Sequence, residues 1–180
     1  MEIPVQFRLL LFGKMIFYEK HNPAQIKISK EGGGVKSILY LLPEKKEDAK
    51  IAHYLIKADD HLPGYTIGYV CNEKSKHYYP ESINVKFISY KDDDLNLFGT
   101  IKSVVLLDQI KSIKYDALVD LNTNFCAPTS MLAYELNIPL KIGFNSLIAD
   151  KLYTITLEHR DGTFLENRFQ LIERLLGIES

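Results

Sequence analysis

VKSILYLL, at residues 35–42, is a nearly continuous apolar run, and it decides the fold of this chain. A strand that is covered by helices on both faces needs this pattern, because both of its sides are buried. A helical pattern follows over 47–57, where apolar residues between Ile51 and Ile56 recur at helical spacing and acidic residues occupy the first turn. Acidic side chains suit the positive end of a helix dipole. The sequence therefore predicts a buried strand followed directly by a helix.

The same alternation of strand and helix continues along the chain. Further strands are predicted at 65–70, 85–90, 117–121 and 140–144, and further helices at 99–114, 130–136 and 163–176. Strands that alternate with helices predict an α/β fold, here one doubly wound, mostly parallel sheet with helices on both faces. Ligands of such folds bind beyond the carboxyl ends of the strands. The candidate site is therefore expected in the loops at 43–48, 71–77, 90–94 and 122–129.

Composition limits the class of protein. The 180 residues are 46% apolar, which is enough for one sizeable core, and Cys71 and Cys126 fit neither a disulfide framework nor a zinc site. This cysteine usage favours a reducing, cytoplasmic compartment. Basic residues number 22 against 23 acidic ones, for a net charge of −1. A balanced charge argues against nucleic acid as a partner.

The first 34 residues are predicted to form an N-terminal helix and a linker ahead of the domain at 35–180. Residues 1–20 are rich in apolar side chains, but Glu2, Arg8 and Lys14 make them unlike a signal peptide or a membrane span. Such a helix could lie on a membrane, on a partner or on its own sheet. The last is favoured, because most apolar stripes belong to a core. The triplet at 32–34 is read as a flexible glycine break.

Motifs for phosphate, metal and hydrolytic chemistry are weak or missing. The loop at 43–48 has no glycine, so its backbone does not suit a dinucleotide pyrophosphate. The Asp-x-Asp spacing within 92–94 could hold a divalent cation, although a run of three aspartates is more typical of a hydrated loop. The five histidines show no metal-binding spacing, and no nucleophile turn of the GxSxG type occurs. The sequence predicts neither a bound metal nor a cofactor.

Asp48 is the residue best placed for catalysis. It stands at the start of the helix that directly follows the central strand, where a carboxylate can face the crevice and act as a general base. The alternative is that Glu47 and Asp48 accept hydrogen bonds from the N–H groups of the first helical turn. Both interpretations are left open by the sequence.

The second half of the chain resembles a known family. The residues that carry the resemblance are YDALVDLN at 115–122, SMLA at 130–133, IPLKIGF at 138–144 and NRFQLIERLLGI at 167–178. This pattern resembles the N-terminal, acceptor-side half of glycosyltransferase family 9, the bacterial heptosyltransferases of lipopolysaccharide synthesis. The resemblance implies a Rossmann-like fold and inverting transfer from a nucleotide-activated sugar. It also implies a cytoplasmic location, either free in the cytoplasm or at the periphery of the inner membrane.

The resemblance also implies roles for particular residues. Asp48 falls on the aspartate that serves the family as catalytic base toward the acceptor hydroxyl. Lys45 and Lys46 would then meet phosphate or carboxylate groups of the acceptor, and Asn122 and Asn124 would contribute to acceptor binding. Two positions depart from the family pattern, which has a glycine before the aspartate and an arginine after the first strand. Glu47 and Leu42 stand at these positions.

The family binds its donor mainly in a second domain, and residues 35–178 resemble the first. The chain is therefore expected to need a second Rossmann-half protein or a homo-oligomer for transfer to a sugar or glycolipid acceptor, and to be a poor catalyst alone. The rival hypothesis is a non-catalytic binding or scaffold protein that kept the fold and lost the site.

Overall fold

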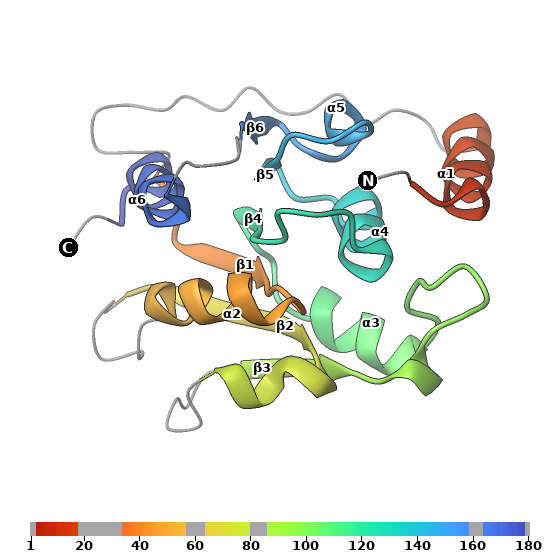
Figure 1. Ribbon diagram of the computed structural model, residues 1–180, viewed down its shortest axis with the longest axis horizontal. Coiled ribbons are helices and arrows are strands. Elements are labelled where there is room, and N and C mark those ends of the chain that lie inside the picture. Colours follow the sequence, from red (N-terminus) through yellow and green to blue (C-terminus); the bar gives the residue numbers. More distant parts are fainter. Residues whose placement is uncertain (1–2, 18–33, 57–63, 80–85, 159–163, 179–180) are drawn as a thin grey trace.

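The protein is described by a computed structural model over residues 3–17, 34–56, 64–79, 86–158 and 164–178 (Figure 1). Its centre is a sheet of six parallel strands in the order β3-β2-β1-β4-β5-β6. The strands are β1 (Ser37–Leu41), β2 (Thr66–Asn72), β3 (Lys86–Tyr90), β4 (Ala117–Asp120), β5 (Leu140–Phe144) and β6 (Ile155–Leu157). This arrangement confirms the predicted α/β class and its Rossmann-like, doubly wound parallel sheet.

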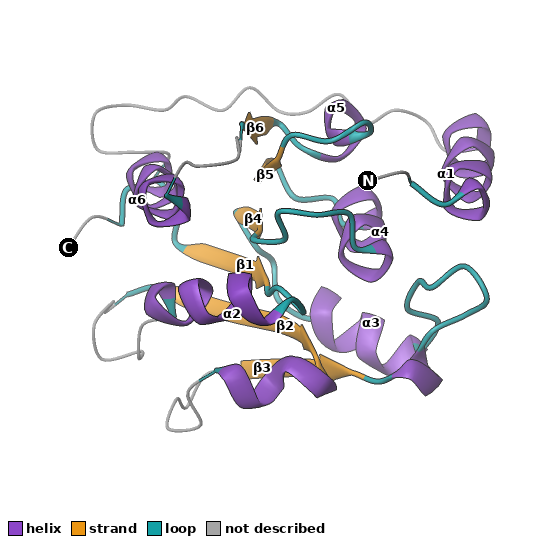
Figure 2. Ribbon diagram, in the orientation of Figure 1, coloured by secondary structure: helices purple, strands orange, loops and turns teal. Residues whose placement is uncertain are grey.

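Helices cover both faces of the sheet (Figure 2). The α-helices are α1 (Val5–Phe17), α2 (Lys46–Ala52), α3 (Val104–Lys111), α4 (Ala127–Glu135), α5 (Ala149–Leu152) and α6 (Leu165–Leu176). The short 3-10 helices are η1 (His53–Leu55), η3 (Glu73–Tyr78) and η4 (Asp92–Asp94). Buried side chains of α2 and α6 pack on one face, and those of α1, α3, α4 and α5 belong to the cluster on the other.

Strand β1 is at the centre of the sheet, and its side chains contribute alternately to the hydrophobic clusters on the two faces. Ile38 and Tyr40 belong to the cluster under α2 and α6, whereas Leu39 and Leu41 belong to the opposite one. Successive side chains of a strand point to opposite faces, so an unbroken apolar run fills two cores at once. Parallel neighbours lie on both sides of β1, since it pairs with β2 and with β4. The carboxyl ends of β1 and β4 therefore flank the point where the strand order reverses.

Several segments differ from the sequence prediction. The helix expected at 99–114 spans Val104–Lys111, because Ile101 forms an isolated bridge with Leu95 and Ser103 caps the helix, and the loop expected at 90–94 contains η4. Residues 155–157 form a sixth strand, β6, which pairs with β5, and residues 149–152 form the short helix α5. Both were missed because three or four residues are too few for a periodic pattern. The polar stretch after β2 was expected as a loop but forms η3, which begins where the Asn72 side chain accepts a hydrogen bond from the Lys74 amide at 2.9 Å. A side-chain cap of this kind supplies a partner for a first-turn N–H group.

The N-terminal helix exists and contacts the domain. α1 buries Phe7 and Leu11, and Phe7 packs edge-on against Phe125 with 4.7 Å between ring centroids. Lys14 of α1 forms an ion pair with Glu135 at the end of α4. None of the helices in the described residues combines the length and the apolar character that crossing a bilayer requires. Most of the predicted linker, at 18–33, lies outside the described residues.

Lys141 on β5 makes the stability of this fold depend on pH. It is half-buried, its Nζ donates to the carbonyl oxygen of Ala133 at 2.6 Å, and burial lowers its pKa from 10.5 to about 8. Between these two values the unfolded chain binds a proton that the folded chain does not, so this group makes unfolding less favourable as pH rises. We expect the free energy of unfolding of the wild type to rise relative to that of Lys141→Met between pH 8 and 9.5. Urea titrations of both proteins measure the difference, and parallel curves would contradict the assignment.

Candidate active site

Glu44 connects the loops at the carboxyl edge of the sheet. Its Oε1 atom accepts hydrogen bonds from Asn72 Nδ2 at 3.0 Å and from the Tyr90 hydroxyl at 2.5 Å, and Cys126 Sγ lies 4.0 Å away. Asn72 ends β2, Tyr90 ends β3 and Cys126 immediately precedes α4. Burial raises the pKa of the Cys126 thiol to about 12 and also raises the pKa of Tyr90, so both groups keep their protons at neutral pH and donate. One carboxylate thus fixes the ends of four consecutive β–α connections.

Asp48 lies at the point where the strand order reverses. It is the third residue of α2, its side chain is 9% exposed, and its Oδ2 accepts a hydrogen bond from Thr123 Oγ1 at 2.5 Å. Thr123 follows β4, and its hydroxyl in turn accepts from Asn124 Nδ2 at 3.1 Å. Asn124, Thr123 and Asp48 therefore form a hydrogen-bonded chain from solvent to a mostly buried carboxylate, across the switch point between β1 and β4. Ligands of open α/β sheets bind at such a point.

The alternative helix-capping role of Asp48 can be compared with this geometry. Lys45 is the N-cap of α2 and makes no side-chain cap bond. Within the described residues, no first-turn N–H group donates to the carboxylates of Glu47 or Asp48, and the recorded partner of Asp48 is the Thr123 hydroxyl. The hydroxyl occupies one carboxylate oxygen and holds the group toward the loop after β4. A carboxylate held in this way is suited to accept a proton through its second oxygen.

Asp120, the last residue of β4, holds the loop that carries Thr123 through hydrogen bonds. This carboxylate is 1% exposed and accepts from the Asn122 amide at 3.0 Å, from Asn122 Nδ2 at 2.8 Å and from the Tyr153 hydroxyl at 2.9 Å. Burial raises the pKa of Asp120, and these hydrogen bonds act in the opposite direction by favouring the carboxylate. Asp120 therefore fixes the turn after β4, from which the Thr123 side chain reaches Asp48 on α2.

The remaining residues named from the sequence lie around this edge with different exposure. Lys45 and Lys46 are exposed at the start of α2, and Asn124 is exposed beside Thr123. Asn122 is half-buried and bonded to Asp120, so it acts within the turn. Leu42 is completely buried in the core, which leaves no cation at the position where the family resemblance implies an arginine.

Four polar residues of this edge were not singled out from the sequence: Glu44, Asn72, Tyr90 and Thr123. Each stands at or within three residues of the carboxyl end of a strand. That position is the signal that could have identified them, because ligand sites of parallel sheets gather there. Their mutual contacts depend on strand order, which the sequence pattern does not specify. Within the described residues, no group of three His, Cys, Asp or Glu side chains is placed to hold a metal ion.

Comparison with known proteins supports the fold assignment. No family model and no curated protein sequence matches this chain. Among solved structures, the family 9 glycosyl transferase of Veillonella parvula matches with a TM-score of 0.55 at 16% identity, over 82% of this chain and 42% of that one. Escherichia coli heptosyltransferase WaaC with ADP matches with a TM-score of 0.52 at 14% identity, over 79% of this chain and 48% of that one. The same enzyme with ADP-2-deoxy-2-fluoro heptose matches with a TM-score of 0.52 at 15% identity, over 79% of this chain and 49% of that one.

These matches share two features. Their sequence identities are low, so they bear on the fold, and the chain spans about half of the length of the structures it matches. The resemblance to glycosyltransferase family 9 that the sequence indicated is therefore found again at the level of three-dimensional structure. This chain has the fold of about half of a family 9 glycosyltransferase.

Proposed function

We propose that this chain is the acceptor-side domain of an inverting glycosyltransferase that resembles the heptosyltransferases, with Asp48 as the general base. The observation that carries the proposal is the position of Asp48, a carboxylate at the switch point whose Oδ2 is held by Thr123. The likeness in fold to a family 9 glycosyl transferase and to a heptosyltransferase supports the reaction class. Cell-envelope glycan synthesis at the cytoplasmic side of the membrane is the corresponding proposed setting.

In the proposed reaction, the second oxygen of Asp48 takes the proton of an acceptor hydroxyl. The hydroxyl oxygen forms a bond to the anomeric carbon of the donor from the face opposite the leaving group, so the configuration inverts. The bond between that carbon and the nucleoside diphosphate breaks, and the diphosphate keeps the electron pair. The Thr123 hydroxyl, which donates to the carboxylate, keeps it oriented toward the acceptor. Desolvation at this mostly buried position strengthens the interaction with the developing charge.

The other proposed roles belong to exposed residues around Asp48. Lys45 and Lys46 would bind anionic groups of the acceptor, since lysine binds phosphate and carboxylate as a mobile point charge. Asn124 would donate to or accept from a sugar hydroxyl, and Asn122 would hold the turn. Stabilisation of the leaving diphosphate is assigned to a donor-binding domain, supplied by a second protein or by another copy of this chain.

Isothermal titration calorimetry tests which of the two substrates, acceptor or donor, this chain binds. We expect the purified chain to bind a deacylated inner-core lipopolysaccharide acceptor. Heat with ADP-heptose alone would show that another copy of this chain supplies the donor site, and no heat with ADP-heptose would assign that site to a second protein. Lys45→Gln combined with Lys46→Gln should weaken acceptor binding by about tenfold, because two exposed cations near an anionic ligand each contribute up to about 1 kcal/mol. Lys111→Gln, an exposed lysine on α3, is the matched control. Absence of acceptor binding would contradict the proposal.

Three observations favour a second candidate, a non-catalytic binding or scaffold protein. Leu42 is part of the core, Glu47 takes the place of a glycine, and Asp48 is already bonded within the chain. A site whose polar groups are satisfied internally can persist for stability after its chemistry is lost. The two functions separate in a transfer assay with a donor-binding domain added, because the scaffold would give no product at any donor concentration.

A further inference from the structure

Helix α1 is apolar on two faces, and the domain covers one of them. Ile3, just before the helix, and Phe7 and Leu11 within it are buried against the domain. On the opposite side, Val5, Leu9 and Phe12 are 64%, 65% and 63% exposed. These three recur at every third or fourth position, so they form one stripe along the helix. A contiguous stripe of large apolar side chains exposed to water is typical of a surface that binds a protein or a membrane.

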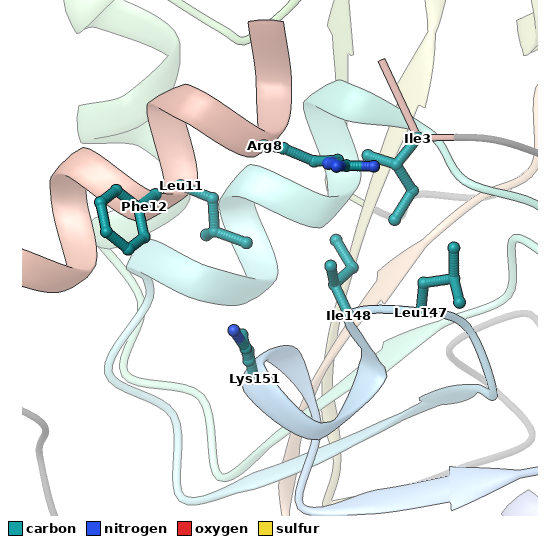
Figure 3. A pocket seen from close by; sticks show the side chains of 7 residues that line it. All are labelled: Ile3, Arg8, Leu11, Phe12, Leu147, Ile148 and Lys151. Carbon is teal, nitrogen blue, oxygen red and sulfur yellow. The ribbon is translucent and has the colours of Figure 1, made fainter. Parts of the chain in front are cut away.

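Beside this stripe lies a hollow of about 300 Å³ between α1 and the connection from β5 to α5 (Figure 3). Its lining consists of Ile3, Arg8, Leu11, Phe12, Leu147, Ile148 and Lys151. Arg8 extends from α1 on one side and Lys151 from α5 on the other, with apolar side chains between them (Figure 3). Leu147, at the rim, is 77% exposed and adds to the outward apolar surface.

The charge of the hollow is positive. No carboxylate belongs to its lining, and within the described residues no ion pair involves Arg8 or Lys151. Of the nearby acids, Glu135 is paired with Lys14, and Asp150 is exposed next to Lys151 on α5. Two cations that share one open hollow favour an anionic group such as a phosphate. The surface thus combines a site for negative charge with protruding apolar side chains.

We propose that this surface, the α1 patch, docks the protein on an anionic phospholipid bilayer. The α1 patch consists of Val5, Leu9, Phe12 and Leu147 as the apolar part and Arg8 and Lys151 as the cationic part. In this arrangement α1 lies in the plane of the interface, with its outer stripe among the acyl chains and a headgroup phosphate between the two cations. The described part of α1 has 13 residues, whereas a membrane span needs about 20.

The position of the α1 patch agrees with this role. Phe7, on the inner side of α1, packs against Phe125 in the loop that also carries Thr123, and Leu147 lies in the connection after β5. The α1 patch therefore borders the carboxyl edge of the sheet, so docking would bring this edge close to the bilayer. The inference does not depend on the proposed sugar transfer, because its test measures lipid binding alone.

Cosedimentation with large unilamellar vesicles tests the proposal. We expect the full chain to bind vesicles of equal parts phosphatidylglycerol and phosphatidylcholine, and to bind pure phosphatidylcholine much more weakly. Arg8→Gln and Lys151→Gln should each reduce binding by about fivefold, since a cation at an anionic surface contributes about 1 kcal/mol. Phe12→Ser and Leu9→Ser should each reduce it by about tenfold or more through lost apolar burial. All four side chains are outside the core, and circular dichroism checks that the variants fold.

Matched controls come from the opposite face of the sheet, where α2 and α6 pack. Phe164, the residue before α6, is 74% exposed, and Lys50 is an exposed cation on α2. Phe164→Ser and Lys50→Gln should bind vesicles like the wild type. Equal losses in these controls, or no binding to anionic vesicles, would overturn the proposal. A dimer in solution that Leu9→Ser dissociates would also overturn it, because a second copy would then cover the stripe.

Discussion

Asp48→Asn should lower the turnover of sugar transfer by about 10² to 10⁴ in an assembly of this chain with a donor-binding domain. Asparagine has the same shape as aspartate, and its Oδ1 can still accept the hydrogen bond that Thr123 donates to the carboxylate. It cannot take a proton from the acceptor hydroxyl. The loss should therefore appear in kcat, with the KM for acceptor nearly unchanged. Initial rates of nucleoside diphosphate release at saturating acceptor measure it.

Two further variants show whether the loss is specific to Asp48. Glu47→Gln removes an exposed carboxylate one residue earlier and should leave the rate unchanged. Thr123→Val removes the hydroxyl that holds Oδ2 and should give a smaller loss of kcat, because the base remains but its orientation is less restricted. If Asp48→Asn turns over at the wild-type rate, Asp48 is a structural partner of Thr123 and the acceptor hydroxyl loses its proton elsewhere.

Part of this site could be predicted because its residues are close in sequence to a strong pattern. Asp48 follows a strongly apolar buried strand within one short loop, and Asn124 follows another well-marked strand, β4. Thr123 lies 75 positions from Asp48, and Tyr90 lies 46 positions from Glu44. These pairs meet because the sheet places β4 directly beside β1 on one side, and β2 followed by β3 on the other. Local periodicity does not specify that order, so the hydrogen bonds of the site required the structure.

The strands, like the site residues, could be predicted where the local sequence pattern is strong and were missed where it is weak. β5 occupies the residues that the pattern indicated, since LKIGF is apolar at every position except Lys141 and is bounded by a proline on one side and polar residues on the other. β6 has one buried residue among its three positions, so its sequence has no apolar run to detect. It exists because the edge of β5 offers unpaired backbone groups, and the chain returning from α5 can satisfy them. Tertiary context, and not propensity, decides such a strand.

Gly143→Ala should destabilise the fold by about 2 to 4 kcal/mol, an unusually large effect for one added methyl group. A Cβ atom at Gly143 would lie 2.4 to 2.6 Å from three ring carbons of Tyr153. The ring cannot move away without cost, because its hydroxyl donates to the buried Asp120 carboxylate at 2.9 Å. The expected cost combines overpacking with the loss of a hydrogen bond to a buried acid. Urea titration at neutral pH measures the change in the free energy of unfolding.

A glycine in α1 and a double-mutant cycle give this prediction its controls. Gly13→Ala adds the same methyl group where no atom lies within 4 Å, and it should stabilise the chain by about 0.5 to 1 kcal/mol through helix propensity. In a Tyr153→Leu background the ring is gone, so the cost of Gly143→Ala should fall by at least about 1 kcal/mol. An unchanged cost in that background would mean that the strain lies in the backbone of β5. If the Tyr153 ring is instead responsible, Gly143→Ala should also loosen the turn that Asp120 holds, and with it the contact between Thr123 and Asp48.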